Sequence, residues 1–191
     1  MKVIAFNGSA RKDGNTAILI RTVFNELEKE GIAAEMLQLA GKKIQGCTAC
    51  YKCFQNKDRR CAIKKDVMNE CIEKMSEADA IILGSPTYFA DVTSAMKALI
   101  DRAGLVSRAN DDMFRRKLGA AVVAVRRGGA IHAFDTINHF FFISQMIVPG
   151  SIYWNVGIGL EIGAVEKDEE GLQTMQILGR NMAWLLKKIH G

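Results

Sequence analysis

Continuous apolar runs alternate with segments of helical spacing along the chain. The runs predict three strands buried on both faces, at 2–6, 80–84 and 118–125, and two weaker strand candidates at 33–39 and 151–158. Apolar residues three and four positions apart predict helices over 16–30, 67–78, 94–103 and 172–190. A βαβ series of five strands follows, which predicts an α/β fold with an open parallel sheet covered by helices.

Length and composition favour one globular domain over residues 1–191. Of the 191 residues 49% are hydrophobic and 25% charged, which excludes a disordered chain and a membrane-embedded one. The opening stretch has a single Lys and a short apolar run, too short for a signal peptide, so we expect a cytoplasmic protein without membrane contact. The net charge of +5 permits an anionic partner, but the basic residues are spread out and we expect no nucleic-acid binding.

The loop between the first strand and the first helix has the composition of an anion site. Backbone N–H groups at a helix start lack internal partners, and Gly8 and Gly14 allow the backbone to approach a ligand closely. Polar and charged side chains add donors at Ser9, Arg11, Asn15 and Thr16. The loop lacks both G-x-G-x-x-G and a Gly-Lys-Ser/Thr ending, so it suits a single phosphate better than a dinucleotide or a nucleoside triphosphate. A plain turn in which Asn15 caps the helix is the alternative.

Two motifs together resemble one known family. The pattern G-S-x-R-x-x-G-N-T at residues 8–16, followed by G-S-P-T-Y at 84–88, is similar to that of the NADPH-dependent FMN reductases. This resemblance implies a flavodoxin-like three-layer sandwich with a five-stranded parallel sheet and FMN as cofactor. It also implies that the first loop binds the FMN phosphate through Ser9, Arg11, Asn15 and Thr16. The predicted cofactor-binding set further includes the next helical residue, Ala17.

Two later loops are candidates for the flavin ring. An isoalloxazine needs an apolar wall and backbone donors, and the loop after 80–84 combines two aromatic residues with a rigid Pro. The resemblance implies FMN contacts from Pro86, Thr87, Tyr88 and Phe89. Alternatively, these aromatics simply cap the core. The loop after 118–125 is rich in glycine, and its backbone N–H groups could stabilise charge on a reduced flavin, which predicts contacts from Arg127, Gly128 and Gly129.

The two arginines of this third loop leave further alternatives open. Arg126 and Arg127 could be solvated loop charges or could dock a phosphate of NADPH. On the helix that follows the aromatic loop, Lys97, Asp101 and Arg102 match the Lys-x-x-x-Asp-Arg pattern of relatives. Lys97 and Asp101 are four positions apart, so we expect an ordinary helix-surface or subunit-contact pair and a structural role for this group.

Four of the five cysteines form the pattern C-x2-C-x2-C-x7-C in a cysteine-rich loop at about 46–62, at Cys47, Cys50, Cys53 and Cys61. Three thiolates at this spacing, closed by a fourth from a flexible loop, can ligate a [4Fe–4S] cluster. The spacing is similar to that of the iron–sulfur flavoproteins, a branch of the same FMN-binding superfamily. Ala62 departs from the Pro of the common ferredoxin run, and free or redox-active thiols and zinc stay as alternatives. Cys71 lies on an apolar stripe and is predicted to belong to the core.

These observations lead to a functional expectation. The resemblance implies an FMN-dependent oxidoreductase that moves electrons from NAD(P)H or a reduced ferredoxin-type carrier to a small acceptor such as a quinone, free flavin or oxygen. The alternative is an electron-transfer protein that holds FMN and a [4Fe–4S] cluster. No catalytic side chain is predicted, because the flavin accepts the hydride itself. The apolar segments 140–143 and 146–148 predict a subunit interface, and hence a homodimer or homotetramer.

Overall fold

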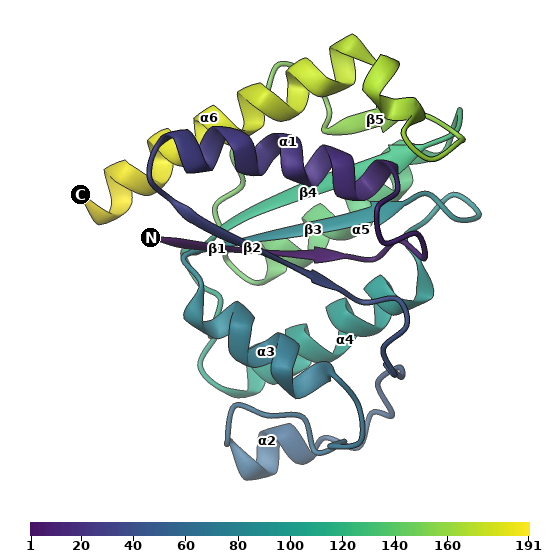
Figure 1. Cartoon of the computed structure of the whole chain (residues 1–191). Coiled ribbons are helices and arrows are strands. Elements are labelled where there is room, and N and C mark those ends of the chain that lie inside the picture. Colours follow the sequence, from purple (N-terminus) through teal and green to yellow (C-terminus); the bar gives the residue numbers. More distant parts are fainter.

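A computed structural model describes the whole chain, residues 1–191, and five strands form a single parallel sheet in it (Figure 1). The strands are β1 (Lys2–Asn7), β2 (Ala33–Gln38), β3 (Ala80–Pro86), β4 (Leu118–Val125) and β5 (Val156–Ile158). Their order across the sheet is β2-β1-β3-β4-β5, and each adjacent pair is parallel. The α/β fold with a five-stranded parallel sheet is thereby confirmed.

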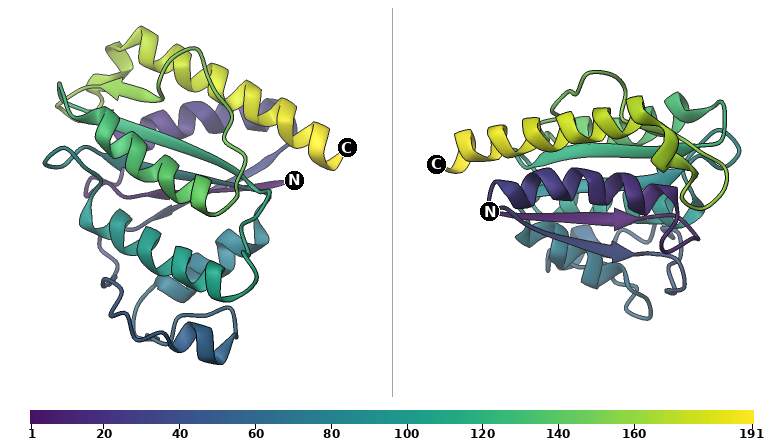
Figure 2. Two further views of the ribbon diagram at one scale, coloured as in Figure 1. Left: turned by 180° about the vertical axis from the view of Figure 1, so that it is seen from behind. Right: turned by 45° about the horizontal axis from the view of Figure 1, so that its top comes forward.

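Helices cover both faces of the sheet, so the molecule has three layers. On one face lie α1 (Asn15–Lys29) and α6 (Glu169–His190), which run side by side (Figure 2). On the other lie α3 (Met68–Glu77), α4 (Ser94–Ala109) and α5 (Ala130–Ile143). Successive strand residues point to opposite faces, and Val3 and Ile4 accordingly belong to two different apolar clusters, one under each helix layer.

Two elements differ from those expected. The sequence left 130–143 without a predicted helix, but α5 forms there and buries Phe140 and Phe141. Gly119 of β4 makes room for it, since a Cβ at this position would lie 2.6 Å from the Phe141 ring. The last strand spans only Val156–Ile158 instead of 151–158, because the residues before it form a loop.

The strand ends place several loops at one edge of the sheet. Because all five strands are parallel, the loops after β1, β3, β4 and β5 leave from the same edge, and the chain order reverses between β1 and β3. The cysteine-rich loop, which includes the short helix α2 (Lys52–Asn56), lies outside the three layers, below α3 and α4 in Figure 1. A 3-10 helix, η1 (Ala164–Lys167), links β5 to α6. None of the helices is long and apolar enough to cross a membrane.

Candidate functional site

The start of α1 offers a cluster of unpaired donors. Gly14 precedes the helix, and no side chain caps it. The backbone N–H groups of Asn15, Thr16 and Ala17 therefore have no acceptor in the chain, because the first bond of the helix runs from Ile18 N–H to the Gly14 oxygen. The hydroxyl of Thr16 is also buried without a partner. Free amides at the positive end of a helix dipole form a site for an anion.

Two side-chain amides, the buried Asn7 and the half-buried Gln38, hold the loop in front of this helix in shape. Asn7, at the end of β1, is 0% exposed and accepts from the Ser9 N–H at 3.0 Å. Its Nδ2 donates to Gln38 Oε1 at 2.7 Å, and Gln38 Nε2 in turn donates to the Ser9 oxygen at 2.6 Å. Sequence reasoning missed both residues. The only local signal was a polar side chain at the end of each of two neighbouring strands.

The segment after β5 completes the same site from far along the chain. The amide of Asn15 donates to the main-chain oxygens of Gly159 and Glu161, both at 3.0 Å. Arg11 Nη1 donates to the oxygen of Leu160 at 2.8 Å. The Asn15 side chain is therefore committed to this segment and is not a free donor, which leaves its backbone N–H for an anion. The Asn15 side chain was expected to donate to a phosphate, but in the structure it positions the segment after β5.

The aromatic loop after β3 forms a tight turn with a strained backbone. Tyr88 and Asp91 exchange backbone hydrogen bonds of 2.8 and 3.1 Å. The two residues between them, Phe89 and Ala90, have φ of 46° and 66°, a conformation that non-glycine residues rarely adopt. Phe89 is fully exposed and Tyr88 about half exposed, so these aromatics do not cap the core. Strain of this kind is concentrated at functional sites.

The loop after β4 packs against the aromatic turn. Gly129 has φ of 85°, and a Cβ on it would lie 3.2 Å from Ala90 Cα and 3.4 Å from Thr87 Cγ2. The hydroxyl of Thr87 is buried and has no partner, like that of Thr16. Of the two arginines in this loop, Arg126 lines the cleft at the sheet edge and Arg127 does not.

A single cleft at the carboxyl edge of the sheet collects most of the predicted FMN residues. Those that line it are Ser9, Arg11, Asn15, Thr16, Pro86, Thr87 and Tyr88. The other predicted residues, Ala17, Phe89, Arg127, Gly128 and Gly129, lie outside its lining. The rest of the wall includes Arg126, for which the sequence left the role open, and four residues that sequence reasoning missed, Ala124, Val125, Gly159 and Leu160. The cleft fits FMN, because it has unpaired donors for a phosphate at one end and an aromatic turn with an unpaired hydroxyl at the other.

The four cysteines of the C-x2-C-x2-C-x7-C pattern line one small apolar pocket below α4. Cys47 and Cys50 are exposed, Cys61 is partly buried and Cys53 is buried. No three His, Cys, Asp or Glu side chains lie close enough together to hold a single metal ion. The segment around them winds through four non-glycine residues with positive φ, namely Ala49, Tyr51, Lys57 and Arg59. The loop thus brings the four cysteines to one pocket, although several of its residues adopt energetically unfavourable backbone conformations.

The thiols differ in their acidity. A backbone hydrogen bond from Lys52 lowers the pKa of Cys50, whereas burial raises the pKa of Cys53. Cys71 lies on α3 and is 0% exposed, and burial raises its pKa to about 12. The prediction that Cys71 belongs to the core is confirmed.

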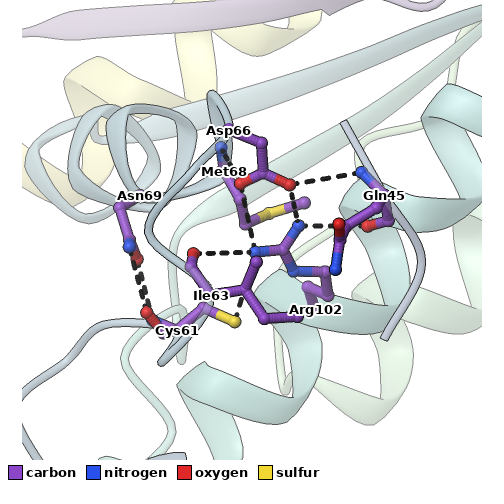
Figure 3. A network of polar contacts seen from close by, with 7 residues as sticks. All are labelled: Gln45, Cys61, Ile63, Asp66, Met68, Asn69 and Arg102. Atoms are coloured by element: carbon purple, nitrogen blue, oxygen red, sulfur yellow. Dashed lines mark hydrogen bonds and ion pairs between the residues drawn. The ribbon is translucent and has the colours of Figure 1, made fainter. Parts of the chain in front are cut away.

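Arg102 closes the base of the cysteine-rich loop (Figure 3). Its side chain is 0% exposed and pairs with both oxygens of Asp66, which is 1% exposed. Burial by itself would raise the pKa of Asp66, but hydrogen bonds from Arg102 and from the backbone of Gln45 and Met68 hold that pKa below its ordinary value. Lys97 and Asp101 form the expected exposed pair on α4.

Strand order, layers and the position of the cleft define a flavodoxin-like α/β protein. Residues 1–161 match the NADPH-dependent FMN reductase family. The chain is also 39% identical to an iron–sulfur flavoprotein of Methanocaldococcus jannaschii, over 99% of each chain. An iron–sulfur flavoprotein of Archaeoglobus fulgidus is 32% identical over 95% of this chain and 94% of its own.

A solved structure supports the fold. RosB, crystallised with 8-demethyl-8-formylriboflavin-5'-phosphate, superposes with a TM-score of 0.76 at 20% identity, over 99% of this chain and 80% of its own. The protein belongs to the NADPH-dependent FMN reductase family. It is an FMN-dependent flavin oxidoreductase, as the sequence motifs implied.

Proposed function

We propose that the cleft binds FMN with its phosphate on the first turn of α1 and its ring against the Tyr88 turn. The observation that carries this proposal is the coincidence of unpaired donors at one edge of the sheet, namely the backbone N–H groups of 15–17 and the hydroxyls of Thr16 and Thr87. Ser9 and Arg11 complete the phosphate end, and Pro86, Phe89 and the loop 127–129 flank the ring. Bound FMN supplies the hydride and electron chemistry, and the protein positions it and its partners.

The electron donor is NAD(P)H or a reduced ferredoxin-type carrier, and the acceptor a small molecule such as a quinone, free flavin or oxygen. The family supports NADPH as donor, and Arg126 at the cleft offers a charge for a dinucleotide phosphate. A carrier protein is supported by exposed basic residues around the cysteines, at Lys52, Lys57, Arg59, Arg60, Lys64 and Lys65. An anionic partner would be steered to such a surface.

The four cysteines 47, 50, 53 and 61 hold a [4Fe–4S] cluster in this proposal. Their spacing, their common pocket and the name of the two archaeal relatives support it. Thiolate sulfur is the ordinary ligand of such clusters, and four are required. The cluster would supply one-electron transfer beside the flavin. This second cofactor favours the alternative function, an electron-transfer protein that does not oxidise NAD(P)H.

The protein acts as a homodimer or homotetramer. The apolar end of α5 is supported as an interface because Phe142 and Ile143 are 60% and 73% exposed. Ile152, Tyr153 and Trp154, also exposed, border the same groove as Phe142. Sedimentation as a monomer at micromolar concentration would rule this out.

An anaerobic absorbance spectrum combined with iron and sulfide analysis tests both cofactors at once. We expect flavin bands and about four iron and four sulfide per chain. Cys53→Ser should remove the iron and keep the flavin, whereas Cys71→Ser, a change in the core, serves as the matched control and keeps both. Protein that stays colourless after incubation with FMN would refute the FMN site. Zinc, or free thiols without iron after anaerobic reconstitution, would refute the cluster.

The donor is decided by two parallel assays on the loaded protein. Bleaching of the flavin by NADPH or NADH under anaerobic conditions supports the oxidoreductase function. Bleaching by a reduced ferredoxin alone, without oxidation of either nicotinamide, supports the electron-transfer alternative. Arg126→Ala should raise the KM for NADPH if this arginine docks a phosphate, and Arg127→Ala is its neighbouring control.

A further inference from the structure

The buried guanidinium of Arg102 contacts both ends of the cysteine-rich loop and one of its sulfurs (Figure 3). Nη1 donates to the main-chain oxygen of Gln45 at 3.0 Å, before the first cysteine. Nη2 donates to the main-chain oxygen of Ile63 at 3.2 Å, after the last one. One side chain from α4, outside the loop, thereby holds the two ends of the cysteine-rich loop together.

Cys61 is held more firmly than its place in the loop would suggest. Its backbone N–H donates to Asn69 Oδ1 at 2.8 Å, and its backbone oxygen accepts from Asn69 Nδ2 at 3.0 Å. Its sulfur accepts from Arg102 Nη2 at 3.3 Å. Asn69 therefore sets the position of the backbone, and Arg102 sets the direction of the sulfur.

Asp66 balances the charge of the Arg102 guanidinium, so the contact from Nη2 to the Cys61 sulfur is a hydrogen bond and not an isolated ion pair. Asp66 neutralises the guanidinium through both of its carboxylate oxygens, and both side chains are almost fully buried. The two N–H groups of Nη2 serve three acceptors, namely Asp66 Oδ1, the Ile63 oxygen and the Cys61 sulfur, so one of these donors is shared. Nε has no acceptor in the chain although it is buried, so Arg102 retains a donor beside the pocket that the four cysteines line.

We propose that Arg102 is a positioning residue that fixes Cys61 as the fourth cluster ligand and stabilises the reduced cluster through its hydrogen bond to the Cys61 sulfur. This inference rests on the proposed [4Fe–4S] site. A cluster bound by four thiolates is anionic and gains further negative charge on reduction. A hydrogen bond to a ligand sulfur therefore favours the reduced form and raises the reduction potential.

The experiment compares Arg102→Lys, Arg102→Met and a control, Arg108→Met, on anaerobically reconstituted protein. Arg108 lies on the same helix, but its pair with Asp112 is exposed. We expect Arg102→Met to lose about a quarter of its iron, one of four atoms, and to show the paramagnetic signal of an oxidised three-iron cluster. We expect Arg102→Lys to keep the iron but to have a more negative cluster potential. Arg108→Met should match the wild type in both measurements.

A second comparison keeps the proposal testable if Arg102→Met does not fold. In a Cys61→Ser background, Arg102→Lys should no longer shift the cluster potential, because the hydrogen bond has lost its sulfur. A full iron content and an unchanged potential in the folded Arg102 variants would overturn the inference and leave the cluster standing. Wild-type protein that takes up no iron and sulfide would overturn the proposed cluster itself, and the inference with it.

Discussion

The side-chain amide of Asn15 donates a hydrogen bond of 3.0 Å to the main-chain oxygen of Gly159, a residue 144 positions further along the chain. The contact joins the first turn of α1 to the loop that follows β5. One wall of the cleft is therefore made by the loop between β1 and α1, and another by the segment that follows β5. We therefore expect the contact between these two segments to affect both the stability of the fold and the binding of FMN.

Asn15→Ala should weaken FMN binding and the fold together. The change leaves the Gly159 oxygen without its side-chain donor and leaves the Glu161 oxygen with only the Ala164 N–H, which costs about 1–3 kcal/mol. The freed loop no longer holds its wall of the cleft, so the FMN dissociation constant should rise about tenfold or more. Asn181→Ala is the matched control, because Asn181 also donates its amide to a main-chain oxygen, that of Gly150, away from the cleft. Equal FMN affinities of the two variants, measured by flavin fluorescence, would contradict this role.

Gly159→Ala tests the close approach directly. A Cβ at Gly159 would lie 2.8 Å from the Val165 nitrogen and 2.9 Å from Asn15 Nδ2, so the backbone must shift. We expect a loss of about 1–3 kcal/mol in the free energy of unfolding, with weaker FMN binding. At Gly150 a Cβ meets nothing within 4 Å, and Gly150→Ala should leave both quantities unchanged. Denaturant titrations with and without FMN separate the two effects.

Thr16→Val should affect the cofactor without harming the free protein. The Thr16 hydroxyl is buried with no partner, so its replacement by a methyl group leaves no hydrogen bond unmade. We expect the unfolding free energy of the FMN-free protein to stay the same or increase. The FMN dissociation constant should rise about fivefold or more, for one lost hydrogen bond to an anion. Thr22→Val on the same helix is the control, because the Thr22 hydroxyl already donates to the Ile18 oxygen. A Thr16→Val protein that binds FMN as the wild type does would exclude the hydroxyl from the site.

Glu26 should contribute to stability in a pH-dependent way. Hydrogen bonds from Lys29 and Arg180 lower the pKa of this carboxyl, and Arg180 joins it from α6. Because the folded pKa lies below the unfolded one, the stabilisation is complete above the unfolded pKa of about 4.3 and is lost as the pH falls through the folded pKa. Glu26→Gln should therefore be less stable than the wild type at neutral pH and should approach it in acid.

The control for that titration is Glu28→Gln, an exposed glutamate of the same helix that forms no ion pair. Its unfolding free energy should follow the wild type at every pH. Urea titrations at a series of pH values between neutrality and acid make the comparison. A constant difference between Glu26→Gln and wild type over this range would show that the carboxylate charge does not matter.

Much of the fold could be predicted from the sequence because its causes are local. A run of apolar residues such as 80–84 indicates a strand that is buried on both faces. The spacing of apolar residues by three and four positions indicates a helix within a few turns. The prediction failed where packing overruled the local pattern. The segment 130–143 has apolar residues around most of its circumference, so no single apolar face indicates a helix. It packs as a helix on the sheet because Gly119 of β4 makes room for Phe141.

The sequence by itself determined the first loop, since the residues from Ser9 to Thr16 are contiguous and a helix start carries its unpaired N–H groups wherever it lies. Tertiary structure decided the rest of the cleft. Only the folded chain brings Gly159 against Asn15 and leaves the Thr16 and Thr87 hydroxyls buried without partners. The spacing of the four cysteines likewise indicated a common site, but Arg102 contacts Cys61 across 41 residues of sequence, and no periodicity encodes a contact between segments that only the tertiary fold brings together.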